Sequence, residues 1–86
     1  IAESPNNKGV AVYPNPFTNQ ATIEVLKPSR NATYSLGVFD RAGREVQRLQ
    51  STSGKFNVDG TKLSAGMYFY QVSDGTWFST GKMVVN

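Results

Sequence analysis

The chain consists of short β-prone segments separated by turn-forming residues, and no stretch has the length and periodicity of an amphipathic helix. Ile23 and Val25 fall on one face of segment 20–27, and Leu36 and Val38 fall on one face of segment 33–40. Turn signals recur about every eight to twelve residues, which is typical of a sandwich of about seven strands. The sequence therefore predicts an all-β fold, an immunoglobulin-like antiparallel β-sandwich.

Local signals set the expected strands and turns. We expect strands at residues 10–13, 20–27, 33–40, 44–49, 55–58, 67–73 and 77–85. The prolines Pro14 and Pro16 deny backbone donors, so they end the first strand in an extended turn. Asp40–Gly43 suits a type I turn with a glycine bulge, and Asp74-Gly75 suits a two-residue type I′ turn. Segment 67–73 is apolar on both faces, which predicts a central strand covered on two sides.

Composition divides the chain into a short leader and one domain. Residues 1–9 are polar and rich in turn formers, as in a linker, and Ile1 does not resemble a translational start. We therefore expect residues 1–9 to link the domain to a missing upstream cargo domain. Residues 10–86 have the length of a single small domain with one modest core.

The residue types present argue against catalysis. The 86 residues include no Cys and no His, which removes thiolate nucleophiles, imidazole bases and the common zinc sites. Asp40, Asp59 and Asp74 each stand beside a turn glycine or shortly before one, so turn chemistry explains them better than a calcium loop or a carboxylate pair. We expect no enzyme activity, no metal site and no cofactor.

Charge and hydropathy argue against two further classes of protein, nucleic-acid binders and proteins that cross a membrane as a helix. The net charge is +3, and the nine Lys and Arg residues are scattered, so a nucleic-acid groove is not expected. No apolar run approaches the roughly 20 residues that span a bilayer, so the chain is not expected to cross a membrane as a helix. Asn31-Ala32-Thr33 matches a glycosylation sequon, which occurs often by chance, and a turn before a strand explains it better.

Two further interpretations stay open. Five aromatic residues can form a stacking platform for sugars, in a carbohydrate-binding or adhesive accessory module, although a small domain needs at least half of them in its core: Tyr34, Tyr68, Tyr70, Trp77 and Phe78. Lys82 interrupts an otherwise apolar last strand. Two roles are open for it: a recognition element for a partner, or a gatekeeper that prevents aggregation through the sheet edge. That strand can also pair with a receptor or with a second copy in a homodimer.

Motifs along residues 10–85 resemble the C-terminal sorting domain of the type IX secretion system. The first is Val12-Tyr13-Pro14-Asn15-Pro16-Phe17, and the second is the strand, turn and strand around Gly43 from Val38 to Val46. The third is the Leu-x-x-Gly-x-Tyr pattern at Leu63, Gly66 and Tyr68, and the last is Gly81-Lys82 with the apolar Met83 and Val84. The family motifs carry over to Pro14, Asn15, Pro16, Gly43, Leu63, Gly66, Tyr68, Gly81 and Lys82.

This resemblance implies a targeting role. A domain of this family is an address label that takes a cargo protein across the outer membrane. Its partners are the type IX translocon, an outer-membrane shuttle protein and a sortase-like peptidase, which removes the domain and joins the cargo to surface lipopolysaccharide. The resemblance implies a secreted protein, in the periplasm during transit and then on the cell surface or outside the cell.

Overall fold

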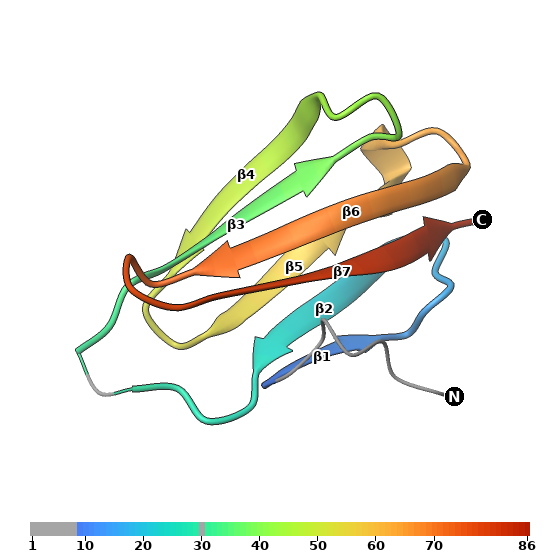
Figure 1. The fold of residues 1–86 in the computed structure, drawn as a ribbon. Coiled ribbons are helices and arrows are strands. Elements are labelled where there is room, and N and C mark those ends of the chain that lie inside the picture. Colours follow the sequence, from blue (N-terminus) through green and yellow to red (C-terminus); the bar gives the residue numbers. More distant parts are fainter. Residues whose placement is uncertain (1–8, 30) are drawn as a thin grey trace.

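The computed structural model describes residues 9–29 and 31–86, which form two antiparallel sheets packed face to face (Figure 1). The expected linker at residues 1–9 lies outside the described residues except for Gly9. The three-stranded sheet has the order β1-β2-β5 and contains β1 (Val10–Tyr13), β2 (Gln20–Val25) and β5 (Lys55–Asp59). The four-stranded sheet has the order β4-β3-β6-β7 and contains β3 (Tyr34–Phe39), β4 (Glu45–Ser51), β6 (Gly66–Ser73) and β7 (Phe78–Val85). A short 3₁₀ helix, η2 (Gly60–Lys62), follows β5.

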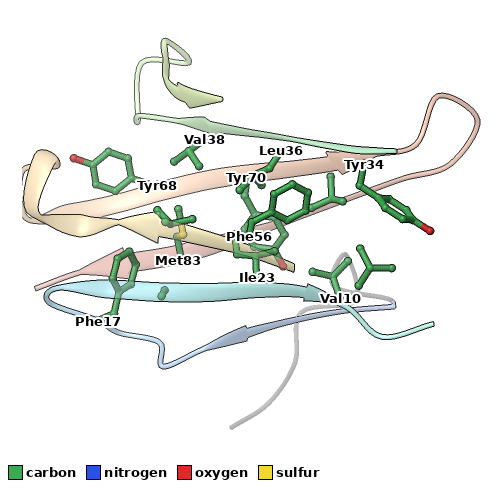
Figure 2. Packing of buried hydrophobic residues seen from close by; sticks show 14 of the residues in the cluster. Val10, Phe17, Ile23, Tyr34, Leu36, Val38, Phe56, Tyr68, Tyr70 and Met83 are labelled. Atoms are coloured by element: carbon green, nitrogen blue, oxygen red, sulfur yellow. The ribbon is translucent and has the colours of Figure 1, made fainter. Parts of the chain in front are cut away.

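Alternating side chains of the strands fill the space between the sheets (Figure 2). Ile23, Leu36, Val38 and Val72 are fully enclosed, and the larger Tyr70 has only 1% of its surface exposed. Removing apolar surface from water is the main favourable term in folding, and here one core supplies it. The core determines which face of every strand points inward, so the alternation in the sequence is a reliable guide to burial.

Contacts at the two lateral sides hold the sheets together. On one side, the Gln47 side chain of β4 donates a hydrogen bond from Nε2 to the Asp59 carbonyl of β5, at 2.9 Å. On the other side, Phe17 forms an isolated parallel bridge with Val85 of β7. The sandwich is therefore closed by backbone pairing on the side where the C-terminal strand lies.

The main sequence predictions are confirmed. The fold is all-β with seven strands, and Tyr34, Leu36 and Val38 point inward. Gly43 has a positive φ of 88°, and its N–H donates to the Asp40 carbonyl at 2.9 Å. The Asp40 N–H donates to the Arg44 carbonyl at 2.9 Å, which completes the predicted type I turn with a glycine bulge. A separate register shift between Val38 and Phe39 leaves Val46 as an extra residue in β4.

One prediction about β6 is wrong. β6 lies inside its sheet, between β3 and β7, but only one of its faces is covered. Tyr68, Tyr70 and Val72 point into the core, whereas Met67 and Phe69 each keep 41% of their surface exposed. In the described part of the chain no element packs on that outer face, because the sandwich has only two layers. Apolar residues on both faces therefore mark an exposed apolar surface here, not a third layer.

The predicted two-residue turn at Asp74-Gly75 is also wrong. Ser73 pairs with Phe78, so four residues connect β6 to β7, and Gly75 alone in this loop has a positive φ. The Asp74 carboxylate accepts hydrogen bonds from the backbone N–H groups of Thr76 and Trp77, at 2.9 and 2.7 Å. The Asp74 N–H still donates to the Trp77 carbonyl at 3.1 Å, and the Asp74 side chain takes the place of its carbonyl as acceptor for the Trp77 N–H. The turn therefore has Gly75 and Thr76 at its centre, one residue later than predicted, and the last strand begins at Phe78.

Candidate functional site

The motif segments, which are far apart in the sequence, meet at one end of the sandwich, where the C-terminus also lies (Figure 1). We call this region the motif end and define it as residues 14–17, 40–43, 62–66 and 81–86. Gly66 at the start of β6 pairs with Val85 at the end of β7, and Phe17 bridges to the same Val85. The turn 40–43 and the loop 63–66 line a common groove of about 470 Å³. The topology therefore brings residues 14–17, the two groove walls and the end of β7 close together, while Gly81 and Lys82 lie further along β7, opposite Tyr70 and Phe69.

The first motif segment holds the C-terminal strand in place. We call Asn15, Pro16 and Phe17 the latch. The Asn15 side chain accepts a hydrogen bond from the Val84 N–H at 3.0 Å, and the Phe17 N–H donates to the Val84 carbonyl at 3.0 Å. The Asn86 N–H donates to the Phe17 carbonyl at 2.8 Å. Pro14 and Pro16 lie exposed on either side of the half-buried Asn15.

Phe17 anchors the latch in the core. Its side chain is 2% exposed and lies against Gly60, where an added Cβ would come within 2.8 Å of the Phe17 ring. The same Cβ would also lie 2.8 Å from the Thr18 carbonyl oxygen, a backbone atom that cannot easily move. Gly60 is therefore required for the close approach of the latch to η2.

The turn at residues 40–43 is stabilised by its own aspartate. Asp40 Oδ1 accepts from the N–H groups of Ala42 and Arg44, at 2.9 and 3.0 Å, and Arg44 Nε donates to Oδ2 at 3.0 Å. The Arg44 N–H is the largest of the effects that hold the pKa of Asp40 below its usual value. The turn presents Arg41 and Gly43 to solvent beside the groove.

The third motif builds the opposite wall of the groove. The buried ring of Tyr68 donates from its hydroxyl to the Ser64 carbonyl at 2.7 Å, which fixes the loop before β6. Leu63 and Gly66 are half-buried in this wall.

Asp59 caps the neighbouring helix η2. Its carboxylate accepts hydrogen bonds from the Thr61 hydroxyl and from the Thr61 N–H. The bond from the hydroxyl is the main reason that the pKa of Asp59 is lowered.

The last motif contributes one buried and one exposed residue. Gly81 is buried opposite Tyr70, and Lys82 is exposed on the outer face of β7. In the sheet register Lys82 pairs with Phe69, which pairs in turn with Phe39. Lys82 therefore stands at the open end of a row of two aromatic side chains on the outer face.

The motif residues divide into supporting and accessible groups. Leu63, Tyr68 and Gly81 are wholly or partly buried and shape the surface from below, whereas the accessible residues are Pro14, Pro16, Gly43 and Lys82. Sequence reasoning did not select Phe17 as a site residue, although a large apolar residue directly after two prolines is a usable signal for an anchor. It also missed Arg41 and Lys62, because only the fold brings them to one groove.

The described part of the chain offers surface and backbone groups for recognition. Three aspartates form hydrogen bonds within their own turns, as the sequence predicts: Asp40, Asp59 and Asp74. Among residues 9–29 and 31–86, no group of three or more acidic side chains could hold a metal ion. In the same residues, no helix is long and apolar enough to cross a membrane.

The aromatic platform for sugars is not formed. Tyr34, Tyr68 and Tyr70 lie in the core, which confirms that at least half of the five aromatic residues are structural. The Trp77 ring packs edge-on against Tyr34, with 6.3 Å between ring centroids and an interplanar angle of 90°. Phe78 is the most exposed of the five, at 64%. The structure thus places these five side chains in different environments instead of on one flat face.

Comparison with known families identifies the domain. Residues 11–86 match the family described as secretion system C-terminal sorting domain. The chain belongs to this family. The match covers all seven strands except the first residue of β1 and includes the whole motif end. The domain is thus a C-terminal sorting domain of the type IX secretion system, a targeting domain carried by secreted proteins.

Solved structures show the same fold. The sorting domain is similar to part of PorZ, an essential bacterial surface component of the type IX secretion system of Porphyromonas gingivalis, with 22% identity and a TM-score of 0.72. That match covers 99% of this chain but only 12% of PorZ. A DUF3244 family protein of Bacteroides vulgatus with an immunoglobulin-like β-sandwich fold matches at 15% identity and a TM-score of 0.72, over 98% of this chain and 90% of its own. No curated protein matches the sequence.

Proposed function

We propose that the folded domain directs a cargo protein through the type IX apparatus and that its motif end is the part that is read. The translocon and an outer-membrane shuttle protein are the proposed readers, and the periplasm is the proposed transit compartment. The observation that carries the proposal is the convergence of four separate motif segments on one surface, which includes the C-terminus (Figure 1). Stability alone would not require the motifs to share one end of the sandwich.

The chemistry of the motif end suits recognition by another protein. It combines fixed loops with exposed cations, because Arg41 and Lys62 line the groove and Lys82 projects from β7. Loops held by side-chain-to-backbone bonds lose little conformational freedom when a partner binds, so more of the contact energy appears as affinity. A surface of this kind is pre-organised in the folded domain and absent from an unfolded chain.

The later steps of sorting are part of the same proposal. A sortase-like peptidase removes the domain and attaches the cargo to surface lipopolysaccharide, so the domain is the substrate in this reaction. On composition, we place the cleavage within residues 1–9, since this segment is polar and rich in turn formers. The alternative of a carbohydrate-binding or adhesive module has less support, because three of its five aromatic residues are buried.

Transplantation onto a reporter tests the proposal. Residues 1–86 are fused to the C-terminus of a fluorescent protein that carries a cleavable signal peptide, in a host with the type IX apparatus. We expect fluorescence at the surface or in the medium, and its loss when the translocon is absent. Retention of a folded fusion in the periplasm of the competent host would contradict the sorting role.

A further inference from the structure

β7 is an edge strand, and part of its outer edge carries unpaired backbone groups. The latch bonds to both the N–H and the carbonyl of Val84, so these two groups point away from β6. Backbone direction alternates along a strand, and β6 and β7 pair without a bulge, so Lys82, Thr80 and Phe78 point their backbone groups the same way. No other described residue bonds to these groups. We call the outward backbone groups of Phe78, Thr80 and Lys82 the open edge.

The latch sets the limit of the open edge. It covers the strand at Val84, where Asn15 and Phe17 already occupy the backbone groups. An added strand could therefore pair along the open edge but not continue past Lys82. Native proteins usually block long free edges, and here the block is confined to the C-terminal part of the strand.

Lys82 gives the open edge a charge preference. Its neighbours in the sheet register are the aromatic residues Phe69 and Phe39, and Glu45 at the far end of the row forms an ion pair with Arg48. Among the described residues, no carboxylate pairs with Lys82. A hollow of about 510 Å³ lies beside it, lined in part by Phe39, Phe69 and Thr80. An unpaired cation beside free backbone groups is complementary to an extended segment that carries a carboxylate.

We propose that the open edge binds an extended acidic segment of a partner protein by β-strand addition. The segment runs antiparallel to β7, exchanges backbone hydrogen bonds with Lys82 and Thr80, places a carboxylate opposite Lys82 and places an apolar side chain opposite Phe78. The proposed sorting role suggests that this partner belongs to the secretion apparatus, so that part of the inference rests on the proposed function. The strand pairing itself rests on the geometry of β7.

Two synthetic peptides test the pairing on the 86-residue chain. The first is acetyl-Glu-Val-Thr-Val-Phe-amide, and the second has Lys in place of Glu. Backbone amide shifts in NMR report where each peptide binds. We expect the acidic peptide to shift the amides of Thr80 and Lys82 at millimolar concentration and the basic peptide to bind more weakly. An exposed ion pair contributes up to about 1 kcal/mol, so the preference should be roughly fivefold.

Variants separate charge from backbone pairing. Lys82→Glu should reverse the order of the two peptides, whereas Lys27→Glu, which makes the same charge change in the loop after β2, should leave it unchanged. Thr80→Pro removes an outward N–H that has no partner, which edge strands tolerate, and should abolish binding of both peptides while the melting temperature changes little. If Thr80→Pro fails to fold, the effect of Lys82→Glu on the order of the two peptides is the test of the inference.

The outcomes distinguish the inference from the sorting role. Absence of amide shifts on the open edge with both peptides, or an unchanged peptide order in Lys82→Glu, would overturn it. Concentration-dependent self-pairing at Thr80 without peptide binding would also overturn it and would identify a homodimer instead. Peptide binding at the open edge in a chain that fails to export the reporter would support the strand pairing and contradict only the sorting role.

Discussion

Asn15 and Phe17 make different contributions to the motif end, although they are neighbours in one motif. Asn15 acts through its side-chain oxygen, which accepts from the Val84 N–H near the surface. Phe17 acts through its ring, which is buried against Gly60, and through its backbone, which pairs with β7. Hydrogen bonding therefore sets the position of the strand end, and burial supplies most of the stabilisation.

Asn15→Ala should lower the free energy of unfolding by about 0.5–1 kcal/mol, because one hydrogen bond is lost at a site that water can partly reach. Urea denaturation measures the change. Asn19→Ala is the matched control in the same loop, since Asn19 contributes its backbone carbonyl, not its side chain, to the Gly60 N–H. Equal losses in the two variants would contradict a specific role for the Asn15 side chain.

Gly60→Ala should be destabilised by about 1–3 kcal/mol, because the new methyl group meets the Phe17 ring and the Thr18 carbonyl at 2.8 Å. Gly37→Ala should cost less, since its close neighbours are the ends of the partly exposed Phe39 and Glu45 side chains, at 2.9 and 3.2 Å, which can move away. Thermal unfolding of the two variants gives the comparison. A larger loss in Gly37→Ala would contradict the anchored latch.

At the scale of elements, local chemistry determines most strands and turns. The turn at residues 40–43 was predictable, since Asp40 and Gly43 occupy the positions that a type I turn with a glycine bulge requires. The β6–β7 loop was not, because the Asp74 side chain takes the N–H groups of Thr76 and Trp77 and changes the register. Alternation predicted which residues of β3 are buried, but the number of layers above β6 depends on the rest of the fold.

Gly43→Ala should lower the free energy of unfolding by about 1–2 kcal/mol. The backbone at this position has a φ of 88°, and an L-residue with a Cβ is strained in this left-handed conformation. The added Cβ meets nothing within 4 Å, so no clash contributes. Gly43→Asn should lose less, because asparagine tolerates this conformation better. Chemical denaturation of both variants checks the order. Equal losses would show that conformational preference does not decide stability at this turn.

At the scale of the whole molecule, the motif end exists only in the folded chain. The sequence motifs identified the family and most of the residues of this surface, because each motif is local. Their convergence depends on the pairing of β6 with β7 and on the bridge from Phe17 to Val85, which join residues far apart in the sequence. The cationic groove was unpredictable for the same reason, since Arg41 and Lys62 come from separate loops.

Stability should depend on pH through the turn aspartates. The folded pKa values of Asp40, Asp59 and Asp74 are lowered by hydrogen bonds, so their contribution is complete above the unfolded value of about 3.9 and is lost as pH falls through the folded values. Asp40→Asn should therefore be less stable than the natural chain near neutral pH, and the difference should shrink in acid. Urea midpoints across this range measure it, and a constant difference would contradict the assignment.

Export of the reporter by charge variants at the two ends of the sandwich tests the central claim most directly. Arg41→Glu with Lys62→Glu alters the motif end, and Lys27→Glu with Lys55→Glu makes the same net change elsewhere on the domain. With both fusions shown to be folded, we predict that export falls for the motif-end pair and stays at the natural level for the other pair. Equal export by the two pairs, or export by an unfolded chain, would contradict the claim that a folded motif end is read.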